Sequence, residues 1–572
     1  MKFTNKKNYF AILAISILLI NTKVSAKSNI DKYYKENISN YFSGVVSSSQ
    51  GYNSKAFKYL KKAKSLQNKH SQFNNEFVKT LVLLGKFNES FTFSKDVWKK
   101  DEYSFEFDLL LGLKAFINKD YKNAEKHFMR FKNFTEYNFI LEDFIGNVLM
   151  AWTRASEGKK KDSFSFIEQN SNQYNDLMKI QNIFLKCYFD QKEVNTLYKE
   201  LIKNKDYDFS RYNFFLANYL LFQNDLDEAK NIITESRKKD GSNLLIKQSE
   251  IFILNGQEKK IKSFFNCKKA SDSIAEFFYI IANLYASEKL YSQSNFYLKI
   301  SLFLNKNFLS NNALLAENFY YQKKYKLSEN IYRSAKSIGE AYSWHASKSI
   351  AKILSKTKGV EKSVESLEKD FNLILNPNFE HYFALANFYK DHEYYEKSVE
   401  YYSLVLDNLK KDHYLIPVVL DRRGTSYERM GKWKLAEKDL KESLNISPDQ
   451  AYVLNYLAYT WVDKKVNLDE SLVMLEKAMD LKKNDPYITD SIGWAYFAKK
   501  KYDKAEYYLQ KAVEMLPGDP IIKDHYADTL WMLNKSIQAR HIWKQILEIS
   551  EIEQKLKDDI NLKLVFGLKK KL

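Results

Sequence analysis

The pattern of hydrophobic and polar positions is clearest between residues 491 and 520. An apolar-rich stretch, a short basic break and a second amphipathic stretch are followed there by Pro-Gly-Asp-Pro. The pattern predicts a helix, a tight turn and a second helix. Pro517 marks the end of the second helix, because proline cannot continue a helix.

This unit recurs along the chain with a period of 34 or 35 residues. The small residue after each break is Ala436, Ser471, Ala505 and Ala539, and the same spacing relates Ala56, Ser90 and Ala124 near the start. About 15 such units fit between residues 39 and 553. A single helix pair cannot bury its own apolar face, so we expect the units to stack into an all-α solenoid.

Small residues stand where neighbouring helices are expected to cross. Gly493 and Ala505 would let the two helices of one unit approach, and Ala512 would let the second helix pack on the next unit. Bulky Tyr496 and Leu509 would fill the space around these crossings.

The spacing of these residues resembles the signature of the tetratricopeptide repeat, at Gly493, Tyr496, Ala505, Leu509, Ala512 and Pro517. The resemblance implies a right-handed α-solenoid of about 15 helix-turn-helix repeats, well formed over 417–553 and degenerate over 39–416. Ser or Val replaces the second-helix Ala in several of the degenerate units. The end of the chain is similar to that of long secreted repeat proteins of Gram-negative, alphaproteobacterial bacteria.

The N-terminus has the pattern of a secretory signal peptide over residues 1–26. Lysines at the start precede an apolar run over 9–20 and the small-residue site Val24-Ser25-Ala26. We therefore expect cleavage near Ala26 and a periplasmic protein; the alternative is an uncleaved anchor in the inner membrane. Residues 27–38 would be a leader and 554–572 a basic C-terminal tail.

Composition agrees with a helical protein and leaves the meaning of its charge open. The chain of 572 residues is 45% hydrophobic but holds only 15 Gly and 6 Pro, which disfavours folds rich in turns. Its formal charge of +19 fits either an anionic partner or a solvated lysine-rich surface. The lysines are dispersed along the chain, which favours the solvated surface. The signal peptide argues against nucleic acid.

The two cysteines, Cys187 and Cys267, lie 80 residues apart, more than two repeats. In a linear stack that separation exceeds the roughly 7 Å between Cα atoms that a disulfide allows. We therefore expect two buried, unbonded thiols.

No sequence motif predicts an enzyme. The repeats occupy almost all of the mature chain, and the sequence has no H-E-x-x-H, phosphate-binding glycine loop or cysteine-rich zinc pattern. We predict no catalytic residues, no cofactor and no metal, and we expect the eight histidines to lie on exposed helix faces.

The resemblance implies a concave groove lined by the first helix of each repeat. The groove positions that it carries over are Asp421, Asn455, Tyr459, Asp490, Trp494, Asp524 and Asp528, with Asn218, Asn283 and Asn387 further back. Such a row can bond to the backbone of an extended chain, or simply solvate an empty face. Carboxylates would repel an acidic ligand, so a basic or neutral protein segment is the expected partner.

These features together predict a non-enzymatic scaffold or adaptor of the cell envelope that binds a partner peptide or helix. The alternative is an envelope component that binds glycan or a membrane surface through its basic and aromatic surface.

Overall fold

The computed structural model describes residues 35–68, 70–133, 141–168, 175–203, 208–239, 241–308, 310–550 and 552–568. Within these ranges the ordered elements are helices, without a strand, and the all-α prediction is confirmed. The predicted signal peptide lies outside the described residues.

The chain divides into two compact units, residues 1–359 and 360–572. The helices of the first unit are α2 (Lys35–Ser49), α3 (Asn53–Lys62), α4 (Ser71–Leu83), α5 (Phe87–Trp98), α6 (Phe105–Ile117), α7 (Tyr121–Phe128), α8 (Leu141–Ser156), α9 (Lys160–Glu168), α10 (Asn175–Tyr188), α11 (Val194–Ile202), α12 (Tyr212–Phe222), α13 (Leu226–Lys239), α14 (Leu244–Leu254), α15 (Glu258–Phe264), α16 (Ala270–Ser287), α17 (Tyr291–Leu304), α18 (Ser310–Tyr321), α19 (Tyr325–Ala335) and α20 (Glu340–Lys358). Those of the second are α21 (Val360–Phe371), α22 (Phe379–Asp391), α23 (Tyr395–Asn408), α24 (Ile416–Arg429), α25 (Trp433–Ile446), α26 (Ala451–Asp463), α27 (Leu468–Leu481), α28 (Pro486–Ala498), α29 (Tyr502–Met515), α30 (Pro520–Met532), α31 (Ser536–Leu547) and α32 (Gln554–Phe566).

Consecutive helices pack in pairs, from α2 with α3 to α18 with α19 in the first unit and from α22 with α23 to α30 with α31 in the second. The boundary between the units falls between α20 and α21. The predicted change from degenerate to well-formed repeats at residue 417 falls inside the second unit.

The small residues lie where the sequence predicted close helix crossings. A Cβ atom on Gly493 would stand 2.5 Å from Cγ of Leu509, and one on Gly112 would stand 2.4 Å from the Phe128 ring. Ala505 and Ala512 are fully buried. These side chains are small because a neighbouring helix fills the space, as predicted.

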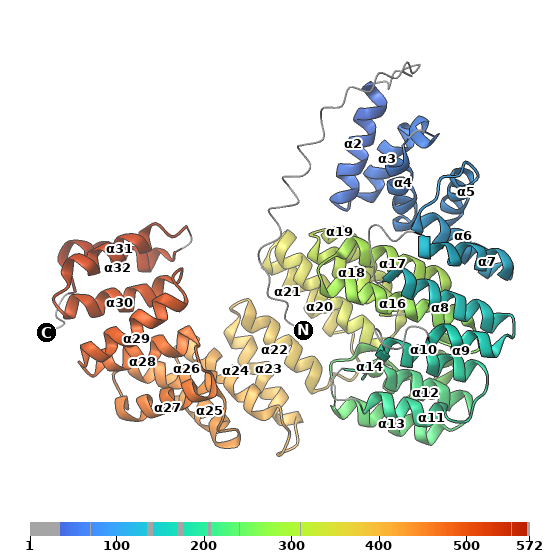
Figure 1. Ribbon diagram of the computed structural model, residues 1–572. Coiled ribbons are helices and arrows are strands. Elements are labelled where there is room, and N and C mark those ends of the chain that lie inside the picture. Colours follow the sequence, from blue (N-terminus) through green and yellow to red (C-terminus); the bar gives the residue numbers. More distant parts are fainter. Residues whose placement is uncertain are drawn as a thin grey trace. The chain divides into compact units, whose positions relative to one another are not determined.

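The first unit closes on itself. Helix α16 packs against α8 and α10, α17 packs against α4, and α14 packs against α20, so repeats far apart in sequence lie side by side (Figure 1). The rings of Phe87 and Phe303 stack with centroids 4.2 Å apart, and Phe144 meets Phe277 at 5.3 Å. One continuous hydrophobic core consequently runs from Tyr41 to Phe319.

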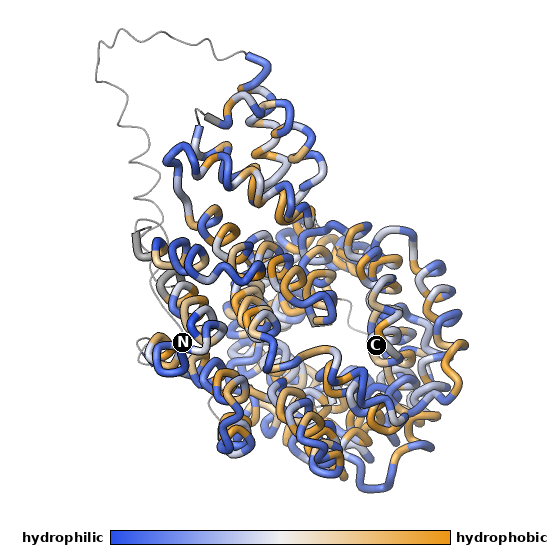
Figure 2. The backbone as a smooth tube through the Cα atoms, turned by 90° about the vertical axis from the view of Figure 1, so that its right-hand side faces the viewer, coloured by the Kyte–Doolittle hydropathy of each residue, from blue (hydrophilic) through white to orange (hydrophobic). Residues whose placement is uncertain are grey.

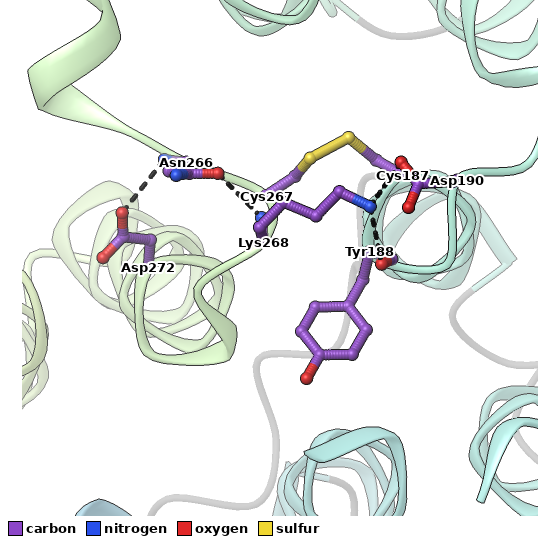
Figure 3. The surroundings of a disulfide bond; sticks show 7 residues. All are labelled: Cys187, Tyr188, Asp190, Asn266, Cys267, Lys268 and Asp272. Carbon is purple, nitrogen blue, oxygen red and sulfur yellow. Dashed lines mark hydrogen bonds and ion pairs between the residues drawn. A yellow bond between two sulfur atoms is a disulfide. The ribbon is translucent and has the colours of Figure 1, made fainter. Parts of the chain in front are cut away.

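This closure corrects the prediction for the cysteines. Cys187, in the last turn of α10, and Cys267, just before α16, form a disulfide with their Cα atoms 6.0 Å apart (Figure 3). Beside it, Lys268 donates to the carbonyl oxygen of Tyr188 at 2.9 Å. The prediction of unbonded thiols is wrong because it assumed a linear stack, whereas the chain returns to α10 after two repeats.

The second unit keeps the simpler arrangement of a stack. Its core consists of separate small clusters, each shared by neighbouring helices. Hydrophobic and hydrophilic positions alternate along the helices (Figure 2). Most of the predicted basic tail forms α32, which packs on α31 through the fully buried Ile560.

Candidate functional site

Four first helices of the second unit each place one polar residue at the equivalent position. We call Asp421 (α24), Asn455 (α26), Asp490 (α28) and Asp524 (α30) the polar row. Asp490 and Asp524 are buried, whereas Asp421 and Asn455 are half-buried. The row is positioned by the regular helix pairs, and its members differ in what they bond to.

Asp490 is bonded to the next first helix. Nδ1 of His525 lies 3.0 Å from both of its carboxylate oxygens, and the imidazole stacks on Trp494 with ring centroids 4.1 Å apart. Burial opposes protonation of His525, but the carboxylate of Asp490 outweighs it and raises the pKa of His525. The prediction of an exposed histidine is wrong here: His525 is 7% exposed and locks Asp490 within the fold.

Asp524 and Asp528 enclose a lysine from the last helix. Nζ of Lys563 lies 2.7 Å from Asp524 and 3.1 Å from Asp528, and the indole of Trp543 donates to both carboxylates. Burial raises the pKa of Asp528 to about 7, and the neighbouring Asp524 adds to this shift. The sequence analysis treated these carboxylates as unneutralised, whereas helix α32 supplies a lysine that pairs with both.

The two earlier members of the row form no ion pair with a basic side chain in the described part of the chain, although the charges of Arg422 and Lys390 act on Asp421 and partly offset the effect of its burial. Burial raises the pKa of the Asp421 carboxyl. The amide oxygen of Asn455 is buried and accepts no hydrogen bond from the described residues. Tyr459, one turn after Asn455, is half-buried, and burial raises the pKa of its hydroxyl.

The three predicted asparagines lie in different environments. Asn218 is buried and donates to the carbonyl oxygen of Ile261 at 2.9 Å, so it is engaged within the fold. Asn387, on α22, accepts a hydrogen bond from Tyr402 at 2.6 Å and another from Arg422. Asn283 is exposed and lines a cavity of about 500 Å³ in the first unit.

That cavity lies among the first helices α10, α12, α14, α16, α18 and α20. Arg211 and Tyr279 are part of its wall. The Arg211 guanidinium makes a bidentate pair with the fully buried Glu276, at 2.9 and 2.8 Å, so its charge is neutralised within the fold. Nothing in the wall selects a ligand class as clearly as the polar row does.

Sequence reasoning missed the partners of the row, His525 and Lys563. The available signal was a basic residue one position after a row residue, at Arg422 and His525; Lys563 lies beyond the last repeat and gave no such signal. No group of three or more His, Cys, Asp or Glu side chains that could hold a metal occurs among the residues described. No described helix is both long and apolar enough to span a membrane.

Residues 491–518 match the family model of the tetratricopeptide repeat. The chain contains a tetratricopeptide repeat. Over 90 residues it is 34% identical to the TPR repeat-containing protein PA4667 of Pseudomonas aeruginosa, a match that covers 16% of this chain and 15% of that relative.

Solved structures are also similar to parts of the chain. A tetratricopeptide repeat protein from Parabacteroides merdae shares 17% identity over 39% of this chain and 87% of its own, with a TM-score of 0.33. MamA from Desulfovibrio magneticus shares 16% identity over 31% of this chain and 97% of its own, with a TM-score of 0.28.

Proposed function

We propose that this protein is a non-enzymatic scaffold or adaptor that binds a segment of a partner protein in the groove of its second unit. The observation that carries the proposal is the polar row, with Tyr459 and Trp494 beside it, on successive first helices of a regular stack. Tetratricopeptide repeat proteins are generally protein-interaction scaffolds, which agrees with this role. A basic or neutral extended segment or helix suits a row rich in acidic residues.

We further propose that the protein works in the periplasm as part of the cell envelope. The signal-peptide pattern at the N-terminus supports this location. The disulfide adds independent support, because disulfides persist in oxidising compartments and are rare in the cytoplasm. Cell fractionation tests the location of the protein. The mass of the purified chain shows whether the signal peptide has been removed and whether the cysteines are bonded. A full-length chain in the cytoplasm with reduced cysteines would contradict them.

Peptide binding tests the groove. Three sets of short, acetylated and amidated peptides, basic, neutral and acidic, are titrated against the full chain by fluorescence anisotropy. We expect at least one set to bind, and we expect Tyr459→Ala to weaken that binding about tenfold, because an aromatic contact in the groove is lost.

Tyr507→Ala is the matched control, since Tyr507 is exposed on the second helix α29. Equal binding by both variants would contradict a groove site. Binding of soluble peptidoglycan fragments in place of peptides would favour the glycan alternative.

A further inference from the structure

In the second unit, basic side chains link a helix to the first helix of the preceding repeat. Each reaches back to an oxygen of the preceding first helix: Arg422 to Asn387, His525 to Asp490, and Lys563 to Asp524. The donors come from α24, α30 and α32, in the order of the stack. The buried Asp490 and Asp524, and the half-buried Asn387 one turn further along its helix, are thus each matched by a basic side chain from a following helix.

The links are missing at Asp421 and Asn455. The residues that occupy the donor position on the following helices are Tyr456 and Ser491, neither of which is basic. The Tyr456 hydroxyl donates instead to Glu428 at 2.9 Å. The Ser491 hydroxyl donates to a carbonyl oxygen within its own helix, that of Tyr487. The described chain thus leaves two consecutive acceptors of the row without the donor that their neighbours have.

We infer that a lysine or arginine side chain of a partner segment supplies the missing donor at Asp421 and Asn455. The inference rests on the proposed groove function. It places the centre of the site at Asp421 and Asn455 instead of at Asp490 and Trp494, which are engaged with His525. The charges of Arg422 and Lys390 only partly offset the burial of Asp421, and a cationic donor in direct contact relieves that burial more strongly than a neutral one. The fold itself uses a cation at each neighbouring link.

The test compares three variants of the full chain with the same three peptide sets. Asp421→Asn removes the charge of the acceptor. Tyr456→Arg places a cation at the donor position, so that the site is filled from within. Asp503→Asn removes an equal charge at an exposed position on α29 and is the control. Circular dichroism and thermal melting verify that each variant is folded.

We expect the basic set to bind the unmodified chain and the control equally. Binding should fall about tenfold in Asp421→Asn and in Tyr456→Arg, the change expected for losing one charge-assisted hydrogen bond. Preference for the neutral or acidic set, still sensitive to Tyr459→Ala, would overturn the cationic partner but leave the groove function intact. Equal loss in Asp421→Asn and Asp503→Asn would show that only overall charge matters. Binding by no set would overturn both proposals.

Discussion

The two units are built from the same helix pair but stabilised differently. In the first, α16 and α17 return to pack on α4, α8 and α10, a disulfide joins α10 to the segment before α16, and one core spans most repeats. In the second, packing runs between helices that are adjacent or next-but-one in sequence, and the core is a series of small clusters. Contacts between distant repeats make the first unit a closed body. In the described helices of the second unit, each repeat is stabilised mainly by its nearest neighbours.

Removal of the disulfide should produce the largest difference between the stabilities of the two units. By the loop-entropy relation, a bond that closes 80 residues stabilises the folded state by about 4.5 kcal/mol. We expect the double substitution Cys187→Ala and Cys267→Ala, or reduction of the native chain, to lower the unfolding temperature of the first unit. The unfolding temperature of the second unit should not change. Calorimetry with and without reductant measures this. Equal shifts of both transitions would show that the units unfold together.

Adding one methyl group at equivalent crossings should test the two kinds of packing. Gly112→Ala would press on Phe128 and Gly493→Ala on Leu509, each at a distance where the neighbour must move. Overpacking of this kind costs about 1–3 kcal/mol. We expect Gly112→Ala to lower the free energy of unfolding more than Gly493→Ala does. The rigid Phe128 ring belongs to the continuous core, whereas Leu509 can change rotamer. Urea unfolding of both variants gives the comparison, and a larger loss at Gly493 would contradict it.

Above about pH 6.5, the pH dependence of stability should come mainly from the second unit. At lower pH, Asp272 and His345 of the first unit also contribute, because burial raises the pKa of Asp272 to about 6 and lowers that of His345 to about 4. The pKa of His525 is raised in the folded state, so its stabilising contribution is present below about pH 6.5 and is lost as the pH rises through the folded value. We therefore expect the second unit to lose stability as the pH rises above about 6.5. The pKa of Asp528 is also raised, to about 7, so its contribution to stability is likewise lost as the pH rises, over a lower pH range.

Thermal melts of the native chain and of His525→Gln measure this effect. The substitution should flatten the profile of the second unit above pH 7. An unchanged slope would assign the pH dependence to another group.

Contacts within a repeat and between neighbouring repeats were predictable from the sequence, and contacts between distant repeats were not. Gly493 and Leu509 meet across one turn, so their spacing alone indicates the crossing. The bond between Cys187 and Cys267 depends on how several repeats curve back, which no local pattern records. The acidic residues of the polar row were predicted, but Lys563, which pairs with Asp524, lies outside the repeats and is placed there only by helix α32.

The smallest predicted effect concerns a turn geometry that also recurs with the repeat. The residue between the two helices has a positive φ in successive units of the second stack, at Gly431 (72°), Lys465 (56°), Lys500 (58°) and Asn534 (63°). A lysine in this region costs about 1–2 kcal/mol, whereas glycine does not, although glycine has a more costly unfolded-state entropy of about 0.4–1 kcal/mol. We therefore expect Lys500→Gly to stabilise the second unit by up to about 1 kcal/mol. Lys500→Ala, which keeps the strain, should give no gain in urea unfolding; an equal gain would mean that loss of the charge, and not relief of the backbone, accounts for the effect.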